Sequence, residues 1–156
     1  MNNMNPTIEN IRKIRAWLLE TIADLSPAQL NEIPAGFNNN IIWNLAHLVA
    51  AQQGLCYIRA GLTPIVEEKY LSNYKSGTKP EAAVNAAEIE AIKKLLFSTL
   101  DQLQADYTNK LFTNYTVFNT RYGATIAGID DAIVFLPYHE GLHSGYITAL
   151  KKLVSN

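Results

Sequence analysis

Apolar residues recur at helical spacing in four long segments of this 156-residue chain, which predicts an all-α fold. Residues that favour helix starts precede the first two segments: Asn5-Pro6 and the asparagines at 38–40. We therefore expect a single domain over residues 1–156, built as a four-helix bundle. The predicted helices cover residues 7–25, 40–61, 85–107 and 125–154.

The connections constrain how these helices run. Residues 62–84 and 108–124 are long for loops of a compact domain, and such connections often carry function. His47 lies about 10 Å from the start of the second helix, and His143 lies about 15 Å from the end of the fourth. The two histidines come closest to the same height along the bundle axis if these two helices are antiparallel. We therefore predict an up-down-down-up bundle with a long crossover between helices 2 and 3.

All three histidines lie where a helical core would place apolar residues. His139 and His143 are four residues apart, about one turn, so their imidazoles project from one face. Buried imidazoles without partners would each cost about 1–3 kcal/mol, and a shared divalent cation satisfies all of them. The sequence predicts His47, His139 and His143 as ligands of Zn or Ni, with a coordination position open for water or substrate.

Residues 139–143, HEGLH, also match the H-E-x-x-H helix of zinc proteases. The extended form of that motif is missing, because Tyr146 and Ala149 stand where glycine and histidine are required. No acidic ligand follows Glu140. A zinc protease is therefore the remotest alternative. Glu140 itself is a candidate catalytic base beside the metal, and a solvated helix glutamate is the other interpretation.

We expect a substrate pocket beside the histidines. Arg121 precedes the fourth helix, where a cation can meet an anionic substrate, and a surface arginine without special contacts is the alternative. For Trp43 the alternative is core packing. Cys56 is expected to be a buried, inert thiol that faces away from the metal. The candidate pocket residues are Trp43, Asn44, Arg121 and Tyr146.

Charged residues make up only 17% of the chain, against about 25% in an average globular protein, which predicts a subunit interface or a large internal pocket. The net charge of −1 argues against binding to nucleic acid or to an anionic membrane. The chain has no long apolar run and no signal-peptide pattern at its start, so we expect a soluble, cytoplasmic protein.

Two motifs point to a known family. Residues 40–47 read N-x-x-W-x-x-x-H, and the last predicted helix carries His139-x-x-x-His143-x-Gly145. Together with four helices and a long middle crossover, they resemble the DinB-like superfamily over nearly the whole chain. The resemblance implies a bundle with a three-histidine metal site that opens to one end, with His47, His139 and His143 as its ligands. It also implies a homodimer.

Some relatives in that superfamily are metal-dependent S-transferases that use low-molecular-weight thiols such as bacillithiol or mycothiol. Others are thiol-dependent isomerases or domains in thiohistidine biosynthesis. The resemblance therefore implies a metal-dependent transferase that acts on a small electrophilic molecule, with a low-molecular-weight thiol as cofactor. Tyr146 departs from the family pattern, since many members have glutamine after H-x-G. The alternative from another class is a non-catalytic helical dimer or interaction module.

Overall fold

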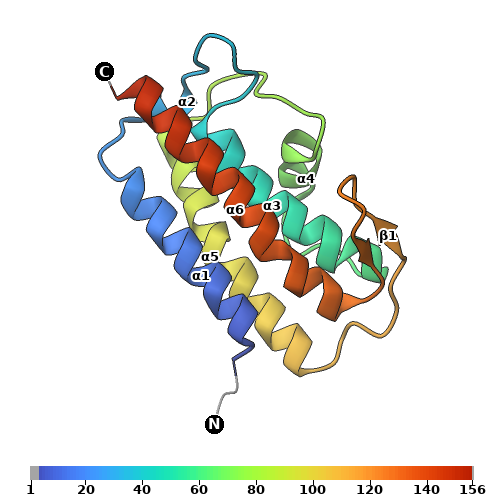
Figure 1. Ribbon diagram of the computed structural model, residues 1–156. Helices are drawn as coiled ribbons and strands as arrows, with labels where there is room; N and C mark the ends of the chain where they lie inside the picture. The colour runs from blue at the N-terminus through green and yellow to red at the C-terminus, as the bar shows by residue number, and fades with distance from the viewer. Residues whose placement is uncertain (1–3, 156) are drawn as a thin grey trace.

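Four long helices form a bundle in the computed structural model, which describes residues 4–155 (Figure 1). The bundle helices are α1 (Pro6–Thr21), α3 (Ile41–Cys56), α5 (Ala86–Thr108) and α6 (Ile129–Val154). The connections contain α2 (Pro27–Asn31), the 3₁₀ helix η1 (Ile58–Ala60) and α4 (Glu68–Tyr74). Strands β1 (Phe118–Asn119) and β2 (Thr125–Ile126) pair antiparallel in a small hairpin.

Helices α1 and α6 run in one direction, and α3 and α5 run in the other (Figure 1). The ends of α1 and α6 lie together, where Lys151 binds Asp24 at 2.7 Å. The start of α1 meets the end of α5, where the backbone N–H of Asn5 donates to Gln104 at 2.8 Å. Both α1 and α3 pack against α5 and α6. The predicted up-down-down-up bundle, with a long crossover between α3 and α5, is confirmed.

Asparagine side chains cap three of the bundle helices. Asn5 accepts from the backbone N–H of Thr7, Asn40 accepts from Trp43, and Asn85 accepts from Glu88. Each such cap satisfies a backbone donor that the first helical turn leaves free. Among residues 4–155, no helix has the length and the apolar content needed to cross a lipid bilayer.

A polar layer crosses the middle of the bundle and separates two apolar clusters. Each long helix contributes one buried residue to it: Arg15, Gln52, Thr99 and Glu140. Arg15 Nη2 donates to Glu140 Oε1 at 2.6 Å, and Nη1 donates to Gln52 Oε1 at 3.0 Å. Thr99 Oγ1 donates to the same Gln52 oxygen at 3.1 Å. Because these bonds link all four helices, the layer defines how the helices are rotated and staggered against one another.

Several predicted boundaries are wrong. The first helix ends at Thr21 rather than near residue 25, and the second ends at Cys56 rather than near Gly61. The last helix begins at Ile129 rather than at residue 125, because residues 125–126 pair with β1. The crossover contains α4, which the apolar spacing does not reveal, since it is only seven residues long.

We predict that Arg15→Met lowers the free energy of unfolding by about 3–5 kcal/mol, because it leaves Glu140 as an unpaired charge in the core. Urea titration measures the change. Adding Glu140→Leu to this variant restores part of the loss, since the buried charge is then gone. Lys93→Met, which breaks the exposed Lys93–Glu90 pair, is the control and costs at most about 1 kcal/mol. Wild-type stability of Arg15→Met would contradict the prediction.

Candidate metal centre and its pocket

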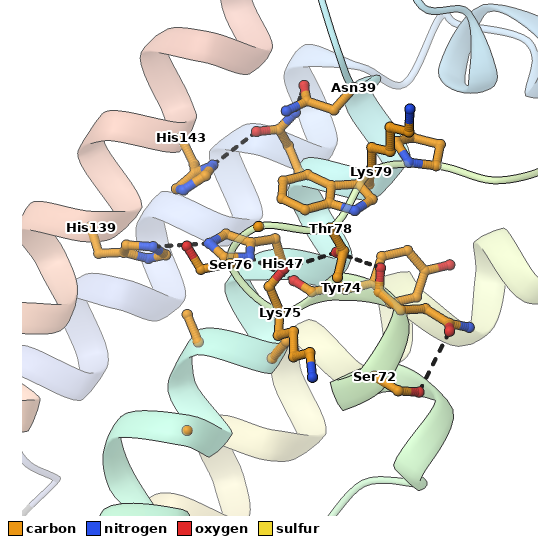
Figure 2. A pocket seen from close by; sticks show the side chains of 18 of the residues that line it. Asn39, His47, Ser72, Tyr74, Lys75, Ser76, Thr78, Lys79, His139 and His143 are labelled. Carbon is orange, nitrogen blue, oxygen red and sulfur yellow. Dashed lines mark hydrogen bonds between the residues drawn. The ribbon is translucent and has the colours of Figure 1, made fainter.

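The three histidines converge between α3 and α6 (Figure 2). One nitrogen of each ring lies within 4.8 Å of the others, and His47 Nε2 lies 3.2 Å from His139 Nε2. Nitrogens that share a zinc ion at about 2.0–2.1 Å are separated by about 2.9–3.4 Å at tetrahedral or octahedral angles. The His47–His139 spacing fits that range. The cluster of His47, His139 and His143 can therefore hold a metal ion, as the sequence predicts.

Hydrogen bonds fix the orientation of two of these rings. His47 Nδ1 lies 2.6 Å from the carbonyl oxygen of Tyr74, and His143 Nδ1 lies 2.8 Å from Asn44 Oδ1. Both partners are oxygens that only accept, so each Nδ1 carries the proton and donates it. Nε2 of both rings is then unprotonated, which is the form that binds a metal.

The amide of Asn44 is itself held in one orientation. Its Nδ2 donates to the carbonyl oxygen of Asn40 at 2.8 Å and to Asn39 Oδ1 at 2.9 Å. A flipped amide would place Nδ2 against His143 and lose both bonds. The asparagines before α3 thus support a histidine on α6, as the dashed contacts in Figure 2 show.

Burial lowers the pKa of all three histidines. The pKa falls to about 3 for His139 and to about 4 for His143, first through loss of hydration and then through neighbouring positive charge. Desolvation also lowers the pKa of His47, against the opposing effect of its bond to Tyr74. The imidazoles are therefore neutral at pH 7, so no proton has to be displaced before a metal binds.

The histidines face an open pocket of about 1880 Å³ between α3, α6, the segment after α4 and the β-hairpin. Trp43 is stacked on His47, with ring centroids 4.9 Å apart and planes inclined by 8°. Tyr146 contacts Phe37 edge-to-face at 5.5 Å. All four residues predicted to lie in a pocket are in its lining: Trp43, Asn44, Arg121 and Tyr146.

Glu140 does not take the position expected of a catalytic base. Its side chain is fully buried, it does not line the pocket, and its Oε1 accepts both Nε and Nη2 of Arg15. The cause is helical geometry, since residue 140 is turned about 100° from His139 and faces the bundle centre. A zinc protease needs this glutamate beside the metal. The arrangement therefore argues against that alternative.

Two contacts were not anticipated from the sequence. The carbonyl of Tyr74 belongs to the backbone, so residue type gives no signal for it. The position of Asn39, next to a helix cap, suggests only a role in capping. Cys56 is fully buried, and burial raises the pKa of its thiol to about 12, as expected for an inert cysteine.

We predict that the protein purified without an affinity tag binds about one divalent ion per chain. Substituting alanine for His47, His139 or His143 should weaken binding more than about 100-fold, because loss of an outer partner alone costs about 10–100-fold. Elemental analysis and calorimetric titration measure stoichiometry and affinity. Ser72→Ala, which changes a pocket-lining residue that is not a ligand, serves as control. Unchanged affinity in His47→Ala would contradict a three-histidine site.

Asn44→Ala should weaken metal binding by about 10–100-fold while the stoichiometry at saturation stays the same, because His143 loses the acceptor that orients it. Asn44→Asp keeps an acceptor oxygen and should bind metal nearly as the wild type does. Thermal unfolding of both variants separates this effect from loss of fold. Equal affinities of Asn44→Ala and Asn44→Asp would show that the bond to His143 does not matter.

Comparison with known proteins identifies the family of the chain. No curated protein matches the chain. The model of the DinB superfamily matches residues 10–147, which include all three histidines and all four bundle helices in whole or in large part. The chain belongs to the DinB superfamily.

Proposed function

We propose that this protein is a metal-dependent transferase that joins a low-molecular-weight thiol to a small electrophilic molecule. The observation that carries the proposal is that three neutral imidazoles from α3 and α6 face an open pocket. Membership of a superfamily that includes thiol S-transferases adds support. Three protein ligands leave at least one coordination position for a substrate, which is typical of catalytic rather than structural sites.

A divalent cation held by His47, His139 and His143 would act there as a Lewis acid that lowers the pKa of a bound thiol or water towards neutrality. The chain's own residues orient the imidazoles and cover part of the site. Asn44 and the Tyr74 carbonyl hold two imidazoles, and the indole of Trp43 covers one face of His47. The pocket volume leaves room for both a thiol and a second molecule.

The lining offers little for acid–base catalysis by side chains. Glu140 is bound to Arg15 in the core, and Glu81 is the one carboxylate that lines the pocket within the described residues. Such a site suits a nucleophile that is acidified by a cation, rather than one deprotonated by a neighbouring carboxylate. This favours transfer of a thiol over chemistry that needs a strong general base.

A non-catalytic module is the second candidate, and one observation favours it. Helix α6 exposes Val134 (70% accessible), Tyr138 and Leu142 at successive turns, and Leu142 also lines the pocket. In this candidate the exposed apolar residues of α6 join two copies of the chain into a homodimer, and the histidines have no catalytic role. The pocket beside the histidines favours the enzyme.

The test is thiol consumption with a panel of alkyl halides, epoxides and unsaturated carbonyl compounds, using the zinc-loaded protein and 2-mercaptoethanol or cysteine. His143→Ala should lower the rate by more than about 100-fold, because the metal contributes several kcal/mol to the transition state. Lys94→Gln, on α5 and away from the pocket, should keep the wild-type rate. Equal rates for wild type and His143→Ala would refute the enzymatic function.

A further inference from the structure

Positive charge is concentrated in the pocket lining. Four of the thirteen basic side chains of the chain line it, against a single acidic residue, Glu81. They come from separate parts of the chain: η1, the segment after α4 and the β-hairpin. Because the net charge of the chain is −1, composition does not explain this excess. The four residues are Arg59, Lys75, Lys79 and Arg121.

These four side chains have no ion-pair partner among residues 4–155, whereas five of the nine other basic residues have one. The guanidinium of Arg59 lies 4.4 Å from the ring centroid of Phe118, a contact that holds the arginine side chain without neutralising its charge. Lys75 and Lys79 lie on either side of His47 in the view of Figure 2. Unneutralised charges of one sign around a concave site concentrate ligands of the opposite sign.

Of these four residues, Arg121 is the best positioned to bind a ligand in the pocket. It lies in the turn between β1 and β2, which is closed by the bond from Thr120 N to the Ala124 carbonyl at 2.8 Å. Its Nη2 donates to the hydroxyl of Tyr122 at 2.7 Å, and Tyr122 packs edge-to-face on Tyr138 of α6 at 5.3 Å. The guanidinium is thus supported from α6 and keeps further N–H groups for a ligand.

Arg121 also lines the same pocket as the three histidines, and the Tyr122–Tyr138 contact ties it to the residue that precedes His139. A ligand that contacts the histidines with one end can therefore place its other end near this guanidinium. The planar fork of arginine favours carboxylate or phosphate groups, which it binds through two parallel hydrogen bonds.

We propose that the pocket binds a small organic anion, with Arg121 holding its carboxylate or phosphate group while its reactive group reaches the three histidines. Lys75, Lys79 and Arg59 add attraction at longer range. This inference rests on the proposed function, since it takes the thiol partner of the metal site as the ligand that carries the negative charge.

Three thiols of similar size test the proposal on cobalt-loaded protein: 3-mercaptopropionate (anionic), 2-mercaptoethanol (neutral) and cysteamine (cationic). Thiolate-to-cobalt absorption reports sulfur at the metal, and calorimetry reports binding of any kind. We expect 3-mercaptopropionate to bind about tenfold more tightly than 2-mercaptoethanol, with cysteamine weakest. Arg121→Gln should reduce this preference to within about twofold, and Arg121→Lys should keep part of it. Raising the salt concentration should also reduce it.

Lys94→Gln is the matched control, because it removes an unpaired, exposed charge from α5 and should leave the preference unchanged. Because the same three thiols are used with every variant, differences in their acidity cancel when the preferences of the variants are compared. Equal binding of the three thiols, or a preference that Arg121→Gln leaves intact, overturns the proposal. If cobalt absorption is absent but calorimetry shows Arg121-dependent binding of 3-mercaptopropionate, the anion site stands and the thiol function fails. If all three thiols give the absorption equally, the thiol function stands and the anion site fails.

Discussion

The buried ion pair between Arg15 and Glu140 is the contact on which the arrangement of the three histidines depends. Glu140 directly follows His139, and adjacent helical residues point about 100° apart. When the carboxylate is bound to Arg15 at the centre of the bundle, α6 can have only one rotation about its axis. That rotation turns His139 and His143 towards α3, where His47 completes the cluster. The interaction that organises the core thus also aims the imidazoles.

The periodic part of the fold could be predicted from the sequence, and the irregular part could not. Four apolar stripes indicate the four long helices, and the depths of His47 and His143 along them are enough to decide the direction of α6 relative to α3. Helix α4 has no side-chain cap and only two buried residues, Tyr70 and Tyr74, so it lacks a periodic signal. The start of α6 depends on strand pairing at residues 125–126, which is a tertiary effect.

The candidate site divides in the same way. The three histidines could be found because polar residues at core positions of a helix need a shared partner. The sequence does not reveal that the Glu140 side chain points to the bundle centre, because its partner Arg15 lies 125 residues away in the sequence. Asn44 was expected to line a pocket, and it does, yet its bond to His143 depends on how two distant helices meet. Spacing within one helix is local information, and pairing between helices is not.

The bond between His47 and the carbonyl oxygen of Tyr74 has a consequence for how such a protein can diversify. A main-chain oxygen is supplied by every amino acid, so this tie survives replacement of the side chain as long as the backbone path is kept. The segment that follows Tyr74 forms one wall of the cavity, with Lys75 and Lys79 in it. Mutation can therefore remodel this wall for a new substrate without releasing the imidazole beside it.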